Sequence, residues 1–164
     1  MIISHRPARW YLLAFLVFVA DQAVKSLVDA ATPLGWSRAV APFFNLVHVL
    51  NPGAAFSFLA SAGGWQRWFF LAIAALASAF LVWMLRDARP RAESLGYSLI
   101  LGGALGNALD RAVRGHVIDY LDFHAGGWHW PAFNLADVSI TVGAACLILA
   151  SLRGSGQPQS QQEA

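Results

Sequence analysis

Residues 65–85, WQRWFFLAIAALASAFLVWML, decide the structural class of this protein. At about 1.5 Å per helical residue, the run is long enough to cross the ~30 Å hydrocarbon core of a bilayer. Charged residues make up 12% of the chain and apolar residues 57%. Soluble domains carry about 25% charged residues, roughly twice this share. We therefore predict an integral membrane protein.

Three further apolar stretches, residues 10–28, 95–113 and 135–152, extend this prediction to a mainly α, polytopic protein with four transmembrane helices. All of residues 1–164 then form a single membrane domain. The first stretch follows a basic tail and also fits a cleaved signal peptide, although its length and the internal Asp21 and Lys25 favour a retained span. Residues 154–164 are rich in Gln, Ser and Gly and are predicted to be a disordered tail.

The placement of arginines predicts the orientation of these spans. With an even number of spans, three regions share one side of the membrane, and each of them carries arginines: Arg6, Arg9, Arg86, Arg89, Arg91 and Arg153. Positively charged loops remain in the cytoplasm. Both termini are therefore expected to be cytoplasmic.

Two segments are left on the outer side. Residues 31–64 contain the β-branched and apolar run FNLVHVL at 44–50, followed by the turn signal NPG at 51–53, which predicts a strand. Residues 54–59 could return as a second strand, so we expect a small outer β element within 31–64. The segment 115–133 is rich in tryptophan and other aromatic residues, and we expect it to lie along the membrane interface.

Polar side chains gather at the outer membrane face in this topology. The third span ends there and the fourth begins there, and the segment between them holds Asp119; the polar residues at these ends are Asn107, Asp110, Arg111, Asn134 and Asp137. Asp119 and Asp137 are distant in sequence, yet the topology brings them to one membrane level. Two neighbouring carboxyl groups share one proton near neutral pH, so the pair could activate water.

Helical spacing adds two possible ion pairs and one close helix contact. Asp110 and Arg114 lie four residues apart, as do Asp21 and Lys25 in the first span. Either pair could be purely structural, or the second could line the site, because charges within a span usually face the bundle interior. The small residues at 102 and 106 would let another helix approach closely.

Other functional classes find less support. The net charge of +2 comes with no basic run, which argues against nucleic-acid binding. The histidines between 116 and 129 lack a recognised metal-ligand spacing, so no metal or other cofactor is expected. The single cysteine, Cys146, fits a small packing residue.

Five motifs resemble the bacterial lipoprotein signal peptidases, or signal peptidase II, over nearly the whole chain. They are DQxxK at 21–25, NPGAAF at 51–56, GGALGNALDR at 102–111, VIDY at 117–120 and FNLAD at 133–137. The resemblance implies four transmembrane helices, a small periplasmic β element and a periplasm-facing interfacial segment. It also implies a protein of the bacterial cytoplasmic (inner) membrane, in contact with lipid and with its active site on the periplasmic side. We further expect a monomer, although the residues themselves do not show the oligomeric state.

The resemblance further implies an aspartic endopeptidase that cleaves diacylglyceryl-modified prolipoproteins just before the lipidated cysteine. Motif matching then gives Asp119 and Asp137 as the catalytic pair. It gives as residues that shape the site Asn51, Asn107, Arg111 and Asn134, and as supporting residues Asp21, Lys25 and Asp110. The residues alone do not say which aspartate carries the proton.

Two other functions remain open on sequence grounds. A small proton- or ion-coupled transporter could use the intramembrane charges Asp21, Lys25, Asp110 and Asp137, but a transport path should place polar groups through the whole bilayer. A non-enzymatic assembly or lipid-binding protein would have the same composition.

Overall fold

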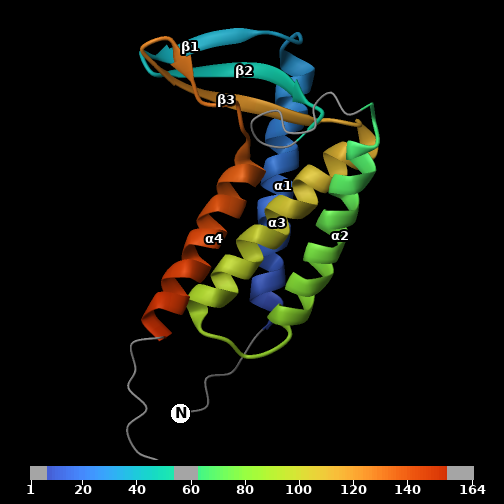
Figure 1. The fold of residues 1–164 in the computed structure, drawn as a ribbon, viewed down its shortest axis with the longest axis vertical. Helices are drawn as coiled ribbons and strands as arrows, with labels where there is room; N and C mark the ends of the chain where they lie inside the picture. The colour runs from blue at the N-terminus through green and yellow to red at the C-terminus, as the bar shows by residue number, and fades with distance from the viewer. Residues whose placement is uncertain (1–6, 54–62, 155–164) are drawn as a thin grey trace, which may run out of the picture.

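The computed structural model describes residues 7–53 and 63–154. In this part of the chain, long helices form a bundle that carries a small sheet across one end (Figure 1). The helices are α1 (Pro7–Ala31), α2 (Gln66–Leu85), α3 (Arg91–Val113) and α4 (Leu135–Gly154). Helix α3 lies in the middle of the bundle and packs against each of the other three.

Three of these helices, α1, α2 and α4, are long and apolar enough to cross a membrane. Many of their large apolar side chains are exposed, among them Phe15, Leu76 and Ile148, as expected of helices that face lipid. Helix α3 is 23 residues long but carries charged residues near both ends, which lowers its apolar character. The chain is thus an integral membrane protein, and all four predicted helices form.

Close packing of α1 on α3 depends on two small residues. A Cβ atom at Gly102 would lie 2.5 Å from the Ala14 carbonyl oxygen, and one at Gly106 would lie 2.5 Å from Asp21 Oδ2. Real side chains do not approach this closely, so alanine at 102 would force the helices apart and alanine at 106 would displace the Asp21 carboxylate. The predicted close helix contact at these two positions is confirmed.

The sheet is antiparallel, with strand order β1-β2-β3-β4. Its strands are β1 (Ser37–Ala41), β2 (Phe44–Asn51), β3 (Val117–Ala125) and the short β4 (Trp128–His129). The strand expected at 44–50 is confirmed as β2. The possible return strand at 54–59 lies outside the described residues, as do Arg6 and residues 155–164 of the expected tail.

Strand β3 occupies much of the segment for which the sequence suggested only an interfacial location. Its first four residues, 117–120, are all buried, because the sheet sits on the ends of the helices and neither face is free there. The alternation of apolar and polar residues that marks a half-exposed strand is therefore absent. Pairing of β3 with β2 sets Asp119 opposite Val49 and Val117 opposite Asn51.

Candidate active site

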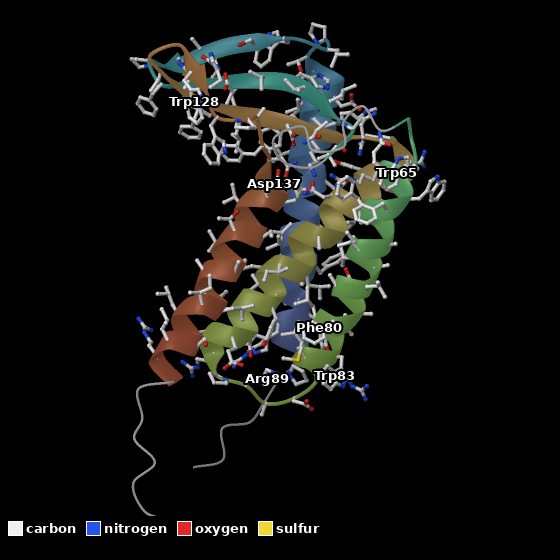
Figure 2. All side chains as sticks on the ribbon, in the orientation of Figure 1. Trp65, Phe80, Trp83, Arg89, Trp128 and Asp137 are labelled. Atoms are coloured by element: carbon white, nitrogen blue, oxygen red, sulfur yellow. The ribbon has the colours of Figure 1, made fainter. Side chains whose placement is uncertain are left out.

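A cavity of about 670 Å³ lies where the ends of α3 and α4 that adjoin the sheet meet strands β2 and β3. Five of the predicted site residues line it: Asn51, Asn107, Arg111, Asp119 and Asp137. Figure 2 shows Asp137 at the junction between the helix bundle and the sheet. Chain segments far apart in sequence thus contribute polar groups to one space.

Asp137 lies in the first turn of α4, where it forms a reciprocal pair with Asn134. The Asn134 backbone N–H donates to Asp137 Oδ2 at 3.2 Å, and the Asp137 N–H donates to Asn134 Oδ1 at 3.1 Å. This is the geometry of a capping box, which satisfies backbone donors that a helix start leaves free. The other carboxyl oxygen, Oδ1, accepts a hydrogen bond of 2.8 Å from the Asn107 amide. The positive end of the helix dipole also favours a carboxylate here.

Asp119 is almost completely buried, with 2% of its surface exposed. Its two oxygens accept amide hydrogen bonds from Asn134, at 2.6 Å, and from Asn51, at 3.0 Å. Burial, followed by the nearby charge of Asp137, raises the pKa of Asp119 to about 7, although the two amides act in the opposite direction. A carboxyl group in this setting can hold a proton at neutral pH while its neighbour is ionised.

Arg111 brings a cationic side chain to the same cavity. Its guanidinium donates to the carbonyl oxygens of Gly53, at 2.7 Å, and Asn107, at 3.2 Å, and stacks 5.0 Å from the ring centre of Phe70. It also interacts electrostatically with both aspartates. A fixed cation beside two carboxyl groups limits the cost of holding negative charge in a buried site.

Beneath the cavity lies a buried charge cluster centred on Lys25. The Lys25 ammonium lies 2.8 Å from Asp21 Oδ2 and 2.9 Å from Asp110 Oδ2, and all three side chains are fully buried. Arg114 completes the cluster with a 2.6 Å contact to Asp110 Oδ1. Both ion pairs expected from the sequence are present, but they are joined through Lys25 rather than separate.

The cluster is connected to the aspartate pair by hydrogen bonds. Lys25 Nζ donates to Asn107 Oδ1 at 2.8 Å, and Asn107 in turn donates to Asp137. Asp21 Oδ1 accepts the backbone N–H of Ala136 at 2.9 Å, which fixes the start of α4. All nine residues predicted for the site therefore belong to one connected network.

Sequence reasoning missed two residues of this network. The Tyr120 hydroxyl accepts the Leu135 N–H at 3.0 Å and so helps to hold the start of α4. Burial raises the pKa of Tyr120 to about 12, so the hydroxyl stays neutral. Gln22 donates to Asp110 Oδ1 and to the Gly106 carbonyl. Each stands beside a predicted aspartate within one of the five motifs, which is the signal that could have indicated it.

The histidines of strands β3 and β4 form a separate group. His129 contacts Asp122 at 2.9 Å, and its ring stacks on that of His124. Burial acts to raise the pKa of Asp122, but hydrogen bonds from His129 and Asn45 lower it overall. In the part of the chain that the structure describes, no group of three or more His, Cys, Asp or Glu side chains could hold a metal ion.

Comparison with known proteins identifies the family. The sequence profile described as "Signal peptidase (SPase) II" matches residues 13–153. The chain belongs to the signal peptidase II family. A lipoprotein signal peptidase of Cupriavidus taiwanensis is 54% identical over 151 residues, which are 92% of this chain and 86% of that protein. One from Serratia marcescens is 48% identical over 156 residues, 94% of this chain and 92% of that protein.

Two solved bacterial membrane enzymes share the fold of this signal peptidase. One has a TM-score of 0.83 and 31% identity and covers 96% of this chain and 95% of its own; the other has a TM-score of 0.77 and 33% identity and covers 89% and 94%. The resemblance inferred from the five motifs is confirmed. Family membership makes the chain a protease, and therefore a hydrolase, of lipoprotein processing.

Proposed function

We propose that this signal peptidase is an aspartic endopeptidase that removes the signal peptide from diacylglyceryl-modified prolipoproteins. It cleaves just before the lipidated cysteine, and Asp119 and Asp137 activate the attacking water. The observation that carries this proposal is that the two carboxyl groups line one cavity and lie close enough for the charge of one to raise the pKa of the other. The relatives named as lipoprotein signal peptidases support the substrate class.

The reaction needs one proton shared between the two aspartates. The ionised member takes a proton from water as the water oxygen attacks the scissile carbonyl carbon, and the protonated member gives its proton to the carbonyl oxygen. In the second step the first aspartate passes its proton to the leaving nitrogen. The C–N bond breaks, and the other aspartate recovers a proton from the diol. Both aspartates then return to their starting states.

The lining of the cavity suits a substrate that is part lipid and part peptide. Its polar end holds Asn51, Asn107 and Arg111, which can orient a peptide backbone. Its other walls include apolar side chains of α4, among them Val138 and Val142. The acyl chains of a prolipoprotein would stay in the bilayer beside these residues while the peptide reaches the aspartates.

We also propose that α3 is a fourth span, that both termini are cytoplasmic and that the site faces the periplasm across the bacterial inner membrane. The first residues of α1 and the last residues of α4 lie at the end of the bundle away from the sheet (Figure 1). Arg89 lies at that same end in Figure 2, in agreement with the rule that positive loops stay inside. One copy of the chain supplies all nine site residues, so the enzyme acts as a monomer in contact with lipid.

The alternative of a proton- or ion-coupled transporter fits less well. Among the described residues, the fully or nearly fully buried charged side chains are Asp21, Lys25, Asp110, Asp119 and Asp122. Asp119 and Asp122 lie on β3, and the other three form the cluster that contacts the start of α4. A transport path would need further charged or titratable groups toward the other end of the bundle.

The proposal is tested by incubating the purified protein with the same precursor in lipidated and unlipidated form. Mass spectrometry of the products should find a new N-terminus at the lipidated cysteine. The unlipidated precursor should remain largely intact. Cleavage at another bond, equal cleavage of both forms, or no cleavage of either would contradict the proposed activity.

A further inference from the structure

Asn107 connects the buried charge cluster to the aspartates, and its amide can be oriented in only one way. An asparagine amide has an acceptor end and a donor end, whereas a lysine ammonium only donates. Because Lys25 Nζ lies 2.8 Å from Asn107 Oδ1, the oxygen must face Lys25. The NH₂ group must then face Asp137 Oδ1, 2.8 Å away.

This orientation gives each carboxyl oxygen of Asp137 a hydrogen-bond donor. Its Oδ1 accepts from the Asn107 amide and its Oδ2 from the Asn134 backbone N–H. Both bonds, together with the position in the first turn of α4, favour the carboxylate over the acid. The Asn107 donor is polarised by the cation on its other end, which strengthens it further.

Asp119 is held differently. Its donors are the side-chain amides of Asn51 and Asn134, it lies on a strand rather than at a helix start, and it is almost fully buried. Neutral amides stabilise a negative charge less than a helix N-terminus and a cation-polarised amide do together. Of the two carboxyl groups, Asp119 is therefore the one that keeps the shared proton.

We propose that Lys25 is a positioning residue of this protease, which fixes the Asn107 amide so that Asp137 is the ionised base and Asp119 is the acid. The inference rests on the proposed aspartate mechanism and adds the assignment of roles within it. Lys25 itself does not touch the substrate; it acts through Asn107. Charged or titratable groups interact with the aspartates from the elements around them: Lys25 from α1, Arg111 from α3 and the Tyr120 hydroxyl from β3. Asp21 and Asp110 stand behind Lys25 as its direct partners.

The first test is the pH profile of cleavage by Lys25→Met. We expect kcat to fall about 10- to 100-fold, because a misplaced catalytic group costs that much, while KM changes less than about threefold. The acidic limb of the kcat/KM profile, where the ionised base becomes protonated, should move up by about one pH unit. If Lys25 had a purely structural role, Lys25→Met would lower the amount of folded enzyme but would not move the acidic limb of the kcat/KM profile.

Two further variants keep this test decisive. Lys25→Met alone leaves Asp21 and Asp110 without their shared cation, so Lys25→Met/Asp21→Asn is measured beside it, because that variant restores the balance of buried charge. Arg114→Gln is the matched control. It removes a positive charge from the same cluster but leaves the contact between Lys25 and Asn107, so its profile should match that of the wild type.

The second test locates the proton directly by infrared difference spectroscopy against the wild type. At about pH 5.5, well above the ordinary carboxyl range, the carbonyl band of a protonated carboxyl group should be lost in Asp119→Asn. It should remain in Asp137→Asn, since burial still keeps Asp119 neutral. Loss of the band in Asp137→Asn instead would overturn the assignment.

The outcomes separate this inference from the proposed function. Suppose that both aspartate variants are inactive but Lys25→Met/Asp21→Asn keeps the wild-type kcat and the wild-type acidic limb of the kcat/KM profile. The positioning role of Lys25 is then refuted, while the assignment of Asp119 and Asp137 as the catalytic pair is unaffected. If the wild-type enzyme does not cleave the lipidated precursor, or if either aspartate variant turns over normally, the proposed function itself fails.

Discussion

Lys25→Met removes the ammonium group that lies between Asp21 and Asp110, and its effect on stability follows from their burial. All three side chains have no solvent exposure, and the ammonium lies within 2.9 Å of both carboxylates. Breaking a buried ion pair by removing one partner costs about 3–5 kcal/mol, because a charge is left uncompensated. We expect Lys25→Met to lose this much unfolding free energy.

Asp21→Asn should cost less, about 1–2 kcal/mol. Lys25 keeps Asp110 as a partner, and the asparagine oxygen can still accept the Ala136 N–H that Asp21 accepts at 2.9 Å. In the double variant Lys25→Met/Asp21→Asn, Asp110 retains Arg114 at 2.6 Å. The double variant should therefore lose less than the two single variants added together, by about 1–3 kcal/mol.

The assay is a double-mutant cycle on reversible unfolding in detergent. Arg89 and Glu93 provide the control pair, because they are also four residues apart in sequence but are partly exposed, with a 3.8 Å contact and Arg89 just before the start of α3. Their coupling should be only about 0.2–1 kcal/mol. If Asp21 and Lys25 are additive within about 0.5 kcal/mol, the claim that they share one buried cluster is refuted.

Three other perturbations have definite expected results. Gly103→Ala would place a Cβ atom 2.5 Å from the Ala136 carbonyl oxygen, so α4 must shift and both the thermal midpoint and kcat should fall; an unchanged kcat would show that the position of α4 is not critical. Burial and the charge of Asp137 raise the pKa of Asp119 from 3.8 to about 7, so the folded state binds a proton that the unfolded chain releases, and stability should fall as pH rises between these values. Asp119→Asn should abolish this slope and be more stable than wild type well above pH 7 by about 4 kcal/mol, whereas an unchanged slope would contradict the buried, protonated state. Reporter fusions after residue 164 and within 31–64 should report the cytoplasm and the periplasm, and the reverse pattern would invert the proposed topology.

The sequence predicted the helices well because their signals are local. A long apolar run can satisfy its backbone hydrogen bonds in lipid only as a helix or a closed barrel, so residues 65–85 already implied α2. The small residues 102 and 106 indicated close helix packing for the same reason, since spacing on one helix is enough to show it. The strand β2 was also recognisable from its residue types and the turn that follows it.

Long-range features were predicted less completely. Strand β3 is buried where it crosses the helix ends, so its sequence lacks the alternation that identifies a half-exposed strand. The two expected ion pairs were predicted from the four-residue spacing within single helices. The structure joins these pairs through the contact between Lys25 on α1 and Asp110 on α3. Spacing within one helix cannot reveal a third partner on another helix. The identity of the site residues came from motifs, and only the folded arrangement connects Lys25 to Asp137.

We propose that Asp119 and Asp137 act as one catalytic unit. Asparagine preserves the shape of each side chain and part of its hydrogen bonding. Asp119→Asn and Asp137→Asn should therefore each fold, insert into the membrane and bind lipidated precursor as the wild type does. Asparagine cannot take a proton from water or supply the acid proton. Each single variant should therefore lose kcat rather than affinity.

The most direct measurement is single-turnover cleavage of a lipidated precursor by wild type, Asp119→Asn, Asp137→Asn and the double variant, with binding measured in parallel. We predict no detectable cleavage by either single variant, binding close to that of the wild type, and a double variant scarcely worse than either one, because losses within a catalytic unit are not additive. Near-normal cleavage by either single variant would remove that aspartate from the mechanism and contradict the account.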